Sequence, residues 1–125
     1  MSLKEKLKVM KMNGIKIVLN VPKWNVEELT GYKPITTFWQ DFSIADRFGI
    51  DAIKDTFSRA FKEWKGNYKY LTELAMVLNH KTWGYYEADN HDYSELYEKL
   101  YKEIDQYACN NLHGKELEYY YDITD

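Results

Sequence analysis

From residue 36 onward, apolar residues recur every three or four positions, and this spacing restricts the fold more than any other feature of the sequence. It is the period of an α-helix that buries one face. Short segments with Gly, Asn or Pro separate the apolar stretches, and short connections favour antiparallel helices packed as a bundle. We expect helices at about 37–47, 51–64, 68–86 and 92–108, followed by a short one at about 115–121.

The stretch at 68–86 has the widest apolar face of the set. Leu71, Leu74 and Leu78 share one side of this helix, and Met76 and Val77 widen that side. A helix with so wide an apolar face is in contact with neighbours over most of its circumference. We therefore expect it to be the most buried helix of the bundle.

Polar residues predict where three of the helices begin. Thr37, followed three residues later by Gln40, matches a capping box. Asp51 is expected to cap the second helix, and Asp92 together with Glu95 the fourth.

Near the N-terminus, Asn-Gly at 13–14 separates two apolar runs, 7–12 and 15–20. This pair predicts a β-hairpin, because both central residues of such a turn need positive φ. The turn would place Lys11 opposite Lys16 on one face and the apolar side chains on the other. The predicted fold class is therefore mainly α: a small multi-helix bundle of about four to five helices with an N-terminal β-hairpin. We expect a single domain over 1–125, with the hairpin at 7–20 and the helical body at 36–125.

Composition excludes several classes of protein. One cysteine, Cys109, allows neither an intramolecular disulfide nor a cysteine pair for zinc. No window approaches eighteen uninterrupted apolar residues, so we expect no membrane span. The first twelve residues carry lysines without the apolar core of a secretion signal. The sequence is thus typical of a bacterial cytoplasmic protein.

Charge is unevenly distributed along the chain. The net charge of −3 is made up of +4 over residues 1–35, +1 over 36–85 and −8 over 86–125. The basic and acidic ends either attract each other, within one molecule or between two, or form separate solvated faces. The N-terminal lysines could also contact phosphates, although the chain has only two arginines and its acidic end would repel nucleic acid.

Five distinctive phrases of the helical region resemble those of a known family. They are TTFWQDFSIADRFG (36–49), AFKEWK (60–65), YKYLTEL (68–74), VLNH (77–80) and YYYDITD (119–125). The chain resembles, over about residues 30–125, an uncharacterised family of small helical bacterial proteins from gut bacteria and their mobile elements. The resemblance implies one helical domain. No activity is assigned to that family, so no catalytic or binding residue is carried over.

Tyrosines form the most unusual pattern among the candidate sites. Tyr93, Tyr97 and Tyr101 recur at i, i+4 on one predicted helix. Such a stripe suits an interface, where tyrosine is enriched, and equally the rim of a core. Together with Lys11 and Lys16 of the hairpin, these tyrosines are our candidate interaction surface.

His80 and Glu73 form a candidate polar site, seven residues apart on one predicted helix. A histidine there could act as a general base, since its ordinary pKa lies near neutral. It could equally be a structural side chain that donates a hydrogen bond within the bundle.

Three other groups carry weaker signals. The acidic loop that contains Asp89 and His91 does not match the spacing of a known metal-binding motif, so we expect no metal. Cys109 and His113 are four residues apart, but a lone cysteine is more often a small buried hydrophobe than a nucleophile. Asp41 and Asp46, like other paired carboxylates here, are interpreted as solvated charge.

The sequence favours a non-enzymatic protein-interaction or accessory module. We expect it to bind a protein partner or a second copy of itself as a homodimer, without a catalytic residue or a cofactor. Two alternatives stay open: a small nucleic-acid-binding or regulatory protein of a mobile element, and a small enzyme that uses His80.

Overall fold

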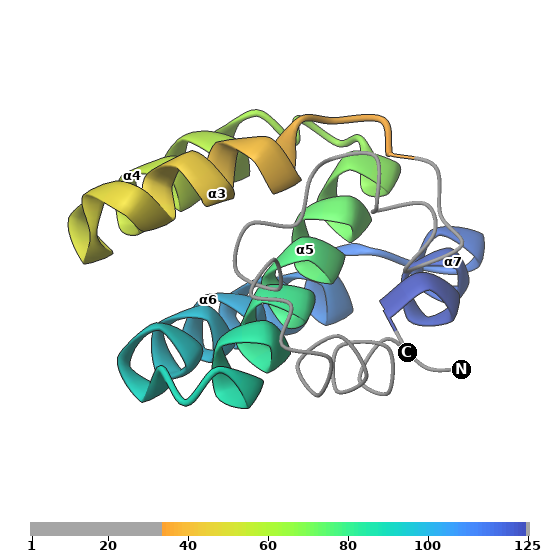
Figure 1. Cartoon of the computed structure of the whole chain (residues 1–125). Helices are drawn as coiled ribbons and strands as arrows, with labels where there is room; N and C mark the ends of the chain where they lie inside the picture. Colours follow the sequence, from red (N-terminus) through yellow and green to blue (C-terminus); the bar gives the residue numbers. More distant parts are fainter. Residues whose placement is uncertain (1–33, 125) are drawn as a thin grey trace.

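The computed structural model describes residues 34–124, which form five α-helices (Figure 1). Each begins within one or two residues of the position that the apolar spacing predicts. The helices are α3 (Phe38–Phe48), α4 (Ile50–Lys62), α5 (Tyr68–Glu87), α6 (His91–Asn111) and α7 (Lys115–Thr124).

The predicted fold class needs a correction. We expected a helical bundle with a β-hairpin, whereas the structure is all-helical, with no strand in residues 34–124. In this range apolar residues keep the helical spacing and nowhere alternate with polar ones for long enough to form a strand. The segment assigned to the hairpin, 7–20, lies outside the described residues.

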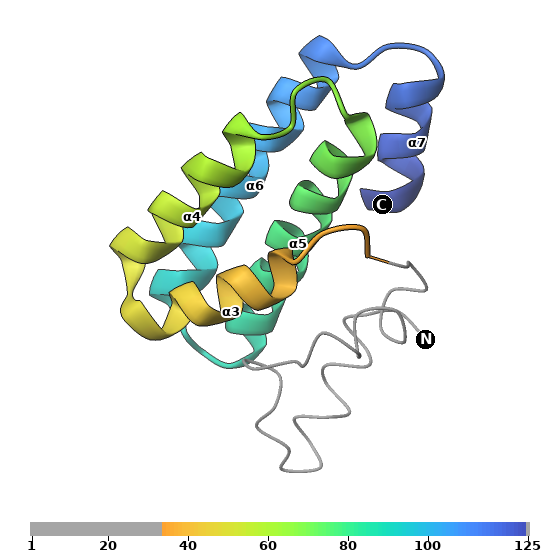
Figure 2. The ribbon, with the colours of Figure 1, turned by 90° about the horizontal axis from the view of Figure 1, so that it is seen from above.

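The helices lie in two layers. α3 and α4 lie side by side as a helical hairpin above α5 and α6, which are also neighbours (Figures 1 and 2). α7 packs mainly against α5. α5 contacts all four other described helices, and its most extensive contact is with α6.

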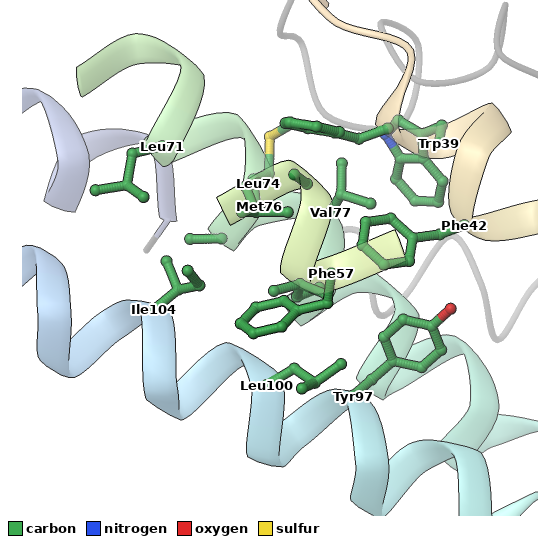
Figure 3. Close-up of a cluster of buried hydrophobic side chains, with 14 of the residues drawn as sticks. Trp39, Phe42, Phe57, Leu71, Leu74, Met76, Val77, Tyr97, Leu100 and Ile104 are labelled. Carbon is green, nitrogen blue, oxygen red and sulfur yellow. The ribbon is translucent and has the colours of Figure 1, made fainter. Parts of the chain in front are cut away.

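This central position explains the burial of α5. All eight residues from 71 to 78 are buried, as the wide apolar face predicts. Aromatic side chains from the other helices meet around it: Figure 3 shows Phe42 of α3, Phe57 of α4 and Tyr97 of α6 converging on one core. The prediction that this helix is the most buried one is confirmed.

The helix caps differ from those that the sequence predicts. Asn67 and Asn90 cap α5 and α6, because each side-chain oxygen accepts a hydrogen bond, of 3.2 Å, from the backbone N–H three residues on. Thr37 makes no side-chain cap and instead donates to Asp41. Asp51 and Asp92 lie inside the first turns of their helices. Thr37 does precede α3 at the N-cap position, so only its capping box is wrong, whereas Asp51 and Asp92 are wrong as caps.

Gly49, with φ of 109°, is the single residue between α3 and α4. Its positive φ lets the chain reverse within one residue, which sets the two helices against each other. None of the five described helices is both long and apolar enough to cross a lipid bilayer.

Candidate functional site

A groove of about 500 Å³ runs between α3 and α4. Alanines leave the space between the two helices, since side chains as small as those of Ala45, Ala52 and Ala60 do not fill it. Phe38 and Tyr70 close one end, with ring centroids 4.9 Å apart. The groove thus has an apolar floor that the two helices build together.

Two large apolar side chains of α3 line the groove and are open to solvent. Phe48 has an exposed fraction of 79%, the largest of any large hydrophobic residue in the described part of the chain. Ile44, one helical turn earlier, is 48% exposed. The two residues share a helix face and so expose apolar surface side by side, which on a folded protein marks a contact surface.

Carboxylates occupy the edges of the groove. Asp41, Asp55 and Glu63 line it, together with a single cation, Arg59. Arg59 forms an ion pair with Asp55, with 2.8 Å between nitrogen and carboxylate oxygen. The remaining carboxylates, Asp41 and Glu63, make the Tyr70 end of the groove negative. The pKa of Tyr70 is raised, first by burial and then by the charges of Glu63 and Asp41.

A second feature is a buried polar network centred on Asp46. Lys81 Nζ lies 2.8 Å from Asp46 Oδ2 and 3.1 Å from Ser43 Oγ. The side chains of Lys81 and Asp46 are only 5% and 6% exposed. The Tyr97 hydroxyl donates to the other carboxylate oxygen, Oδ1. The network ties α3, α5 and α6 together, and the interpretation of Asp46 as solvated charge is wrong.

Two more tyrosines complete this network. The Tyr93 hydroxyl donates to the main-chain oxygen of Asp46 at 3.0 Å, and the Tyr85 ring stacks on Tyr97 with centroids 5.8 Å apart. Burial, and next the neighbouring Asp46, raise the pKa of both Tyr85 and Tyr97 well above the ordinary value. Both phenols are therefore protonated near neutral pH. Their hydroxyl groups stabilise the buried carboxylate.

Burial lowers the pKa of Lys81, whereas the charge of Asp46 raises it. Both carboxylate oxygens of Asp46 accept hydrogen bonds from side chains of other helices. A hollow of about 460 Å³ adjoins it, with Asp46, Tyr85 and Tyr93 among its lining residues. The arrangement is that of a structural joint between helices.

The structure does not join His80 and Glu73. Glu73 is fully buried, and the backbone N–H of Ile35 donates to both carboxylate oxygens at 3.1 Å, so that Glu73 fastens the chain before α3 onto α5. Burial raises the pKa of Glu73, whereas the hydrogen bonds from Ile35 and Thr36 lower it. No hydrogen bond or ion pair between Glu73 and His80 occurs within residues 34–124.

His80 packs instead against Trp39, with ring centroids 5.7 Å apart. Burial lowers its pKa to about 4. His80 Nδ1 and Trp39 Nε1 are both buried, and neither has a hydrogen-bond partner among the described residues. The imidazole is thus neutral near pH 7 and belongs to the packing between α3 and α5.

The tyrosine stripe faces the interior of the bundle. Tyr97 is fully buried, and Tyr93 and Tyr101 are half-buried. This geometry corresponds to the rim of a core, one of the two interpretations of the stripe. Lys11 and Lys16, the other members of the predicted surface, lie outside the described residues.

The weaker candidates are not brought together into a site. No three His, Cys, Asp or Glu side chains within residues 34–124 lie close enough to share a metal ion. His91 packs edge-on against Tyr86. Cys109 is exposed, with Sγ 3.0 Å from the Tyr121 hydroxyl, so its prediction as a buried hydrophobe is wrong.

Sequence reasoning missed the groove and the Asp46 network. One signal was available for Asp46: it lies seven residues after Trp39 and four after Phe42, on the apolar face of α3. No comparable signal existed for the groove, which needs α3 and α4 side by side. Comparison with protein-family models, with curated proteins and with solved structures gave no match to this chain.

Proposed function

We propose that this protein is a non-enzymatic interaction module that binds a protein partner through the groove between α3 and α4. The observation that carries the proposal is the 79% exposure of Phe48 at the edge of an apolar groove. Burying a phenylalanine side chain stabilises a contact by roughly 1.5–3 kcal/mol. A phenylalanine this exposed contributes little to the fold, and together with the exposed Ile44 it forms the kind of apolar patch that marks an interaction site.

The buried titratable groups support a binding role over catalysis. His80, the residue on which an enzyme would depend, packs against Trp39, and its pKa of about 4 makes the ring a weak base near pH 7. Lys81 and Asp46 are fixed in an ion pair with only 5% and 6% of their side chains exposed.

The charge of the helical body favours a protein over a nucleic acid as partner. Residues 34–125 contain 17 Asp and Glu against 10 Lys and Arg. Phosphate binding depends on an excess of Lys and Arg that neutralises phosphate charge. We propose the bacterial cytoplasm as its location, and the family resemblance leaves a role in a mobile element open.

Photo-crosslinking tests the proposal. A benzoylphenylalanine in place of Phe48 is expected to crosslink to one discrete protein in bacteria that carry this gene. The same group in place of Tyr86, which is 51% exposed but does not line the groove, is the matched control. Crosslinks that are absent at both positions, or equal at both, would contradict the proposal.

A further inference from the structure

We infer that the groove between α3 and α4 binds a basic amphipathic helix of another protein, with apolar side chains towards the α3–α4 turn and lysines or arginines towards Tyr70. This inference rests on the proposed function and names the chemistry of its partner. It follows from the shape of the groove, the order of its lining residues and their charge.

The length of the groove fits a short helix. The groove is lined along α3 from Phe38 to Phe48, and at the helical rise per residue this corresponds to about 15 Å. This is about three turns of a partner helix, which would present apolar side chains at i, i+3 or i+4, and i+7. The alanine floor allows the partner helix to approach closely.

The two ends of the groove differ in polarity. Phe48, Ala52 and Ile44 lie near the turn around Gly49 and form an apolar end. Asp41 and Glu63 lie at the other end, beside Tyr70. A helix that fills the groove therefore places apolar residues at one end of its buried face and cations at the other.

The negative end is open to a cationic partner. Arg59 is already paired with Asp55, so it compensates neither Asp41 nor Glu63. Lys65 lies 3.5 Å from Glu63, but both side chains are more than 60% exposed, and such a surface pair is weak. A lysine or arginine of a partner would form ion pairs with Asp41 and Glu63 at the rim.

The same charges disfavour a second copy of this groove as the occupant. In a twofold symmetric dimer the two grooves pair in opposite directions, so Asp41 and Glu63 of each copy would face the apolar end of the other. Carboxylates covered by apolar side chains lose hydration without gaining a cation, which weakens such an interface. The structure thus favours a partner of opposite charge.

A designed peptide tests the chemistry of the partner directly. The probe is a helix of about 14 residues, made of leucine at i, i+3, i+4 and i+7 and of lysine elsewhere. The control peptide has glutamate in place of every lysine. Fluorescence anisotropy with the full chain should show that the lysine peptide binds, and that the glutamate peptide does not.

Variants of the protein locate the binding site. Two variants should each weaken binding of the lysine peptide about tenfold: Phe48→Ser, and the double variant Asp41→Asn with Glu63→Gln. The matched control is Glu95→Gln with Glu103→Gln, which removes two exposed carboxylates of α6 and should change affinity less than about twofold. All five positions are exposed, and circular dichroism checks that each variant keeps its helices.

Three outcomes would overturn the inference. The first is that both peptides bind equally. The second is that the α6 pair weakens binding as much as Asp41 and Glu63 do. The third is that photo-crosslinks at position 48 map to a second copy, or to residues 1–33 of the same chain. Discrete crosslinks to a partner, without binding of the lysine peptide, would leave the proposed function in place and overturn the partner chemistry alone.

Discussion

At the scale of single residues, burial decides what an ion pair contributes. Lys81 and Lys102 each hold a carboxylate at 2.8 Å, Lys81 with Asp46 and Lys102 with Glu98. The first pair is almost fully enclosed, whereas the side chains of the second are 72% and 49% exposed. Water screens the attraction between the two charges of the exposed pair. The buried charges have lost their hydration, so each depends on its partner for stabilisation.

We expect Lys81→Met to lower the free energy of unfolding by about 3–5 kcal/mol, because it leaves the Asp46 carboxylate buried without its cation. Lys102→Met, the matched control on an exposed pair of equal length, should change it by less than about 0.5 kcal/mol. Urea denaturation followed by circular dichroism measures both. Similar losses for the two variants would show that burial does not set the contribution of the Lys81 pair.

His80 should make stability depend on pH. Burial lowers its pKa from the ordinary 6.5 to about 4, so between these values the unfolded chain binds a proton that the folded protein does not. The free energy of unfolding therefore falls as the pH drops from about 7 to about 4, by up to about 3 kcal/mol for this ring.

Denaturation of the native chain and of His80→Leu across this pH range isolates that contribution. Loss of stability from carboxylates is common to both proteins, and only the native chain should show the additional loss. His113→Leu, which replaces an exposed histidine, serves as the control and should behave like the native chain. Parallel curves for the native chain and His80→Leu would contradict the prediction.

At the scale of elements, α3 separates the residues that hold the fold from those that are free to bind. It carries three phenylalanines; Phe42 is fully buried, whereas Phe48 is 79% exposed. Phe42 packs edge-on against Tyr97, with ring centroids 5.9 Å apart. One helix thus contributes to the core with one face and to the groove with another.

Phe42→Ala is expected to cost about 3–5 kcal/mol of unfolding free energy, since it leaves a cavity among packed rings. Phe48→Ala, the same change on the same helix, should stay within about 0.5 kcal/mol. Thermal or urea denaturation measures the difference. A large loss on Phe48→Ala would mean that Phe48 supports the fold, and would remove the main support for the proposed function.

The beginnings of α5 and α6 depend on their asparagine caps. Asn67→Ala and Asn90→Ala should each cost about 1 kcal/mol, because each leaves a backbone N–H without its acceptor. Asn110→Ala, near the exposed end of α6, is the control and should cost nothing, since alanine has the better helix propensity. Urea denaturation that gives equal values for all three would contradict the role of the caps.

At the scale of the whole molecule, α5 makes the bundle one cooperative unit. It contacts every other described helix, so a change in its core reaches both layers. Small domains with one continuous core unfold in a single transition. Tryptophan fluorescence reports on local packing at Trp39 of α3, at Trp64 against Tyr107 of α6 and at Trp83 of α5, while the helical signal reports on all elements.

We expect Leu74→Ala, at a fully buried position of α5, to destabilise the protein by about 2–5 kcal/mol. Because the core is shared, tryptophan fluorescence and circular dichroism should show the same shift of one transition. Leu96→Ala, at a half-buried position of α6, is the control and should cost less. Separate transitions for the two probes would show that the layers unfold independently.

The candidate sites were less predictable than the helices. From the sequence, Glu73 is paired with His80 and Asp46 is interpreted as solvated charge, yet Glu73 anchors the backbone of Ile35 and Asp46 holds Lys81. Their partners are 38 and 35 residues away along the chain. Such contacts depend on how the helices pack. The local pattern places Asp46 on the apolar face of α3 but does not identify its partner.

The sequence by itself determined where the helices form and that α5 is the central one, because helix period and apolar width are properties of neighbouring residues. Only the tertiary structure decided which polar side chains are enclosed and which apolar ones stay open. Positions 42 and 48 of the same helix are both phenylalanine. Burial of the first depends on Tyr97, 55 positions further along the chain, and no such neighbour covers the second among the described residues.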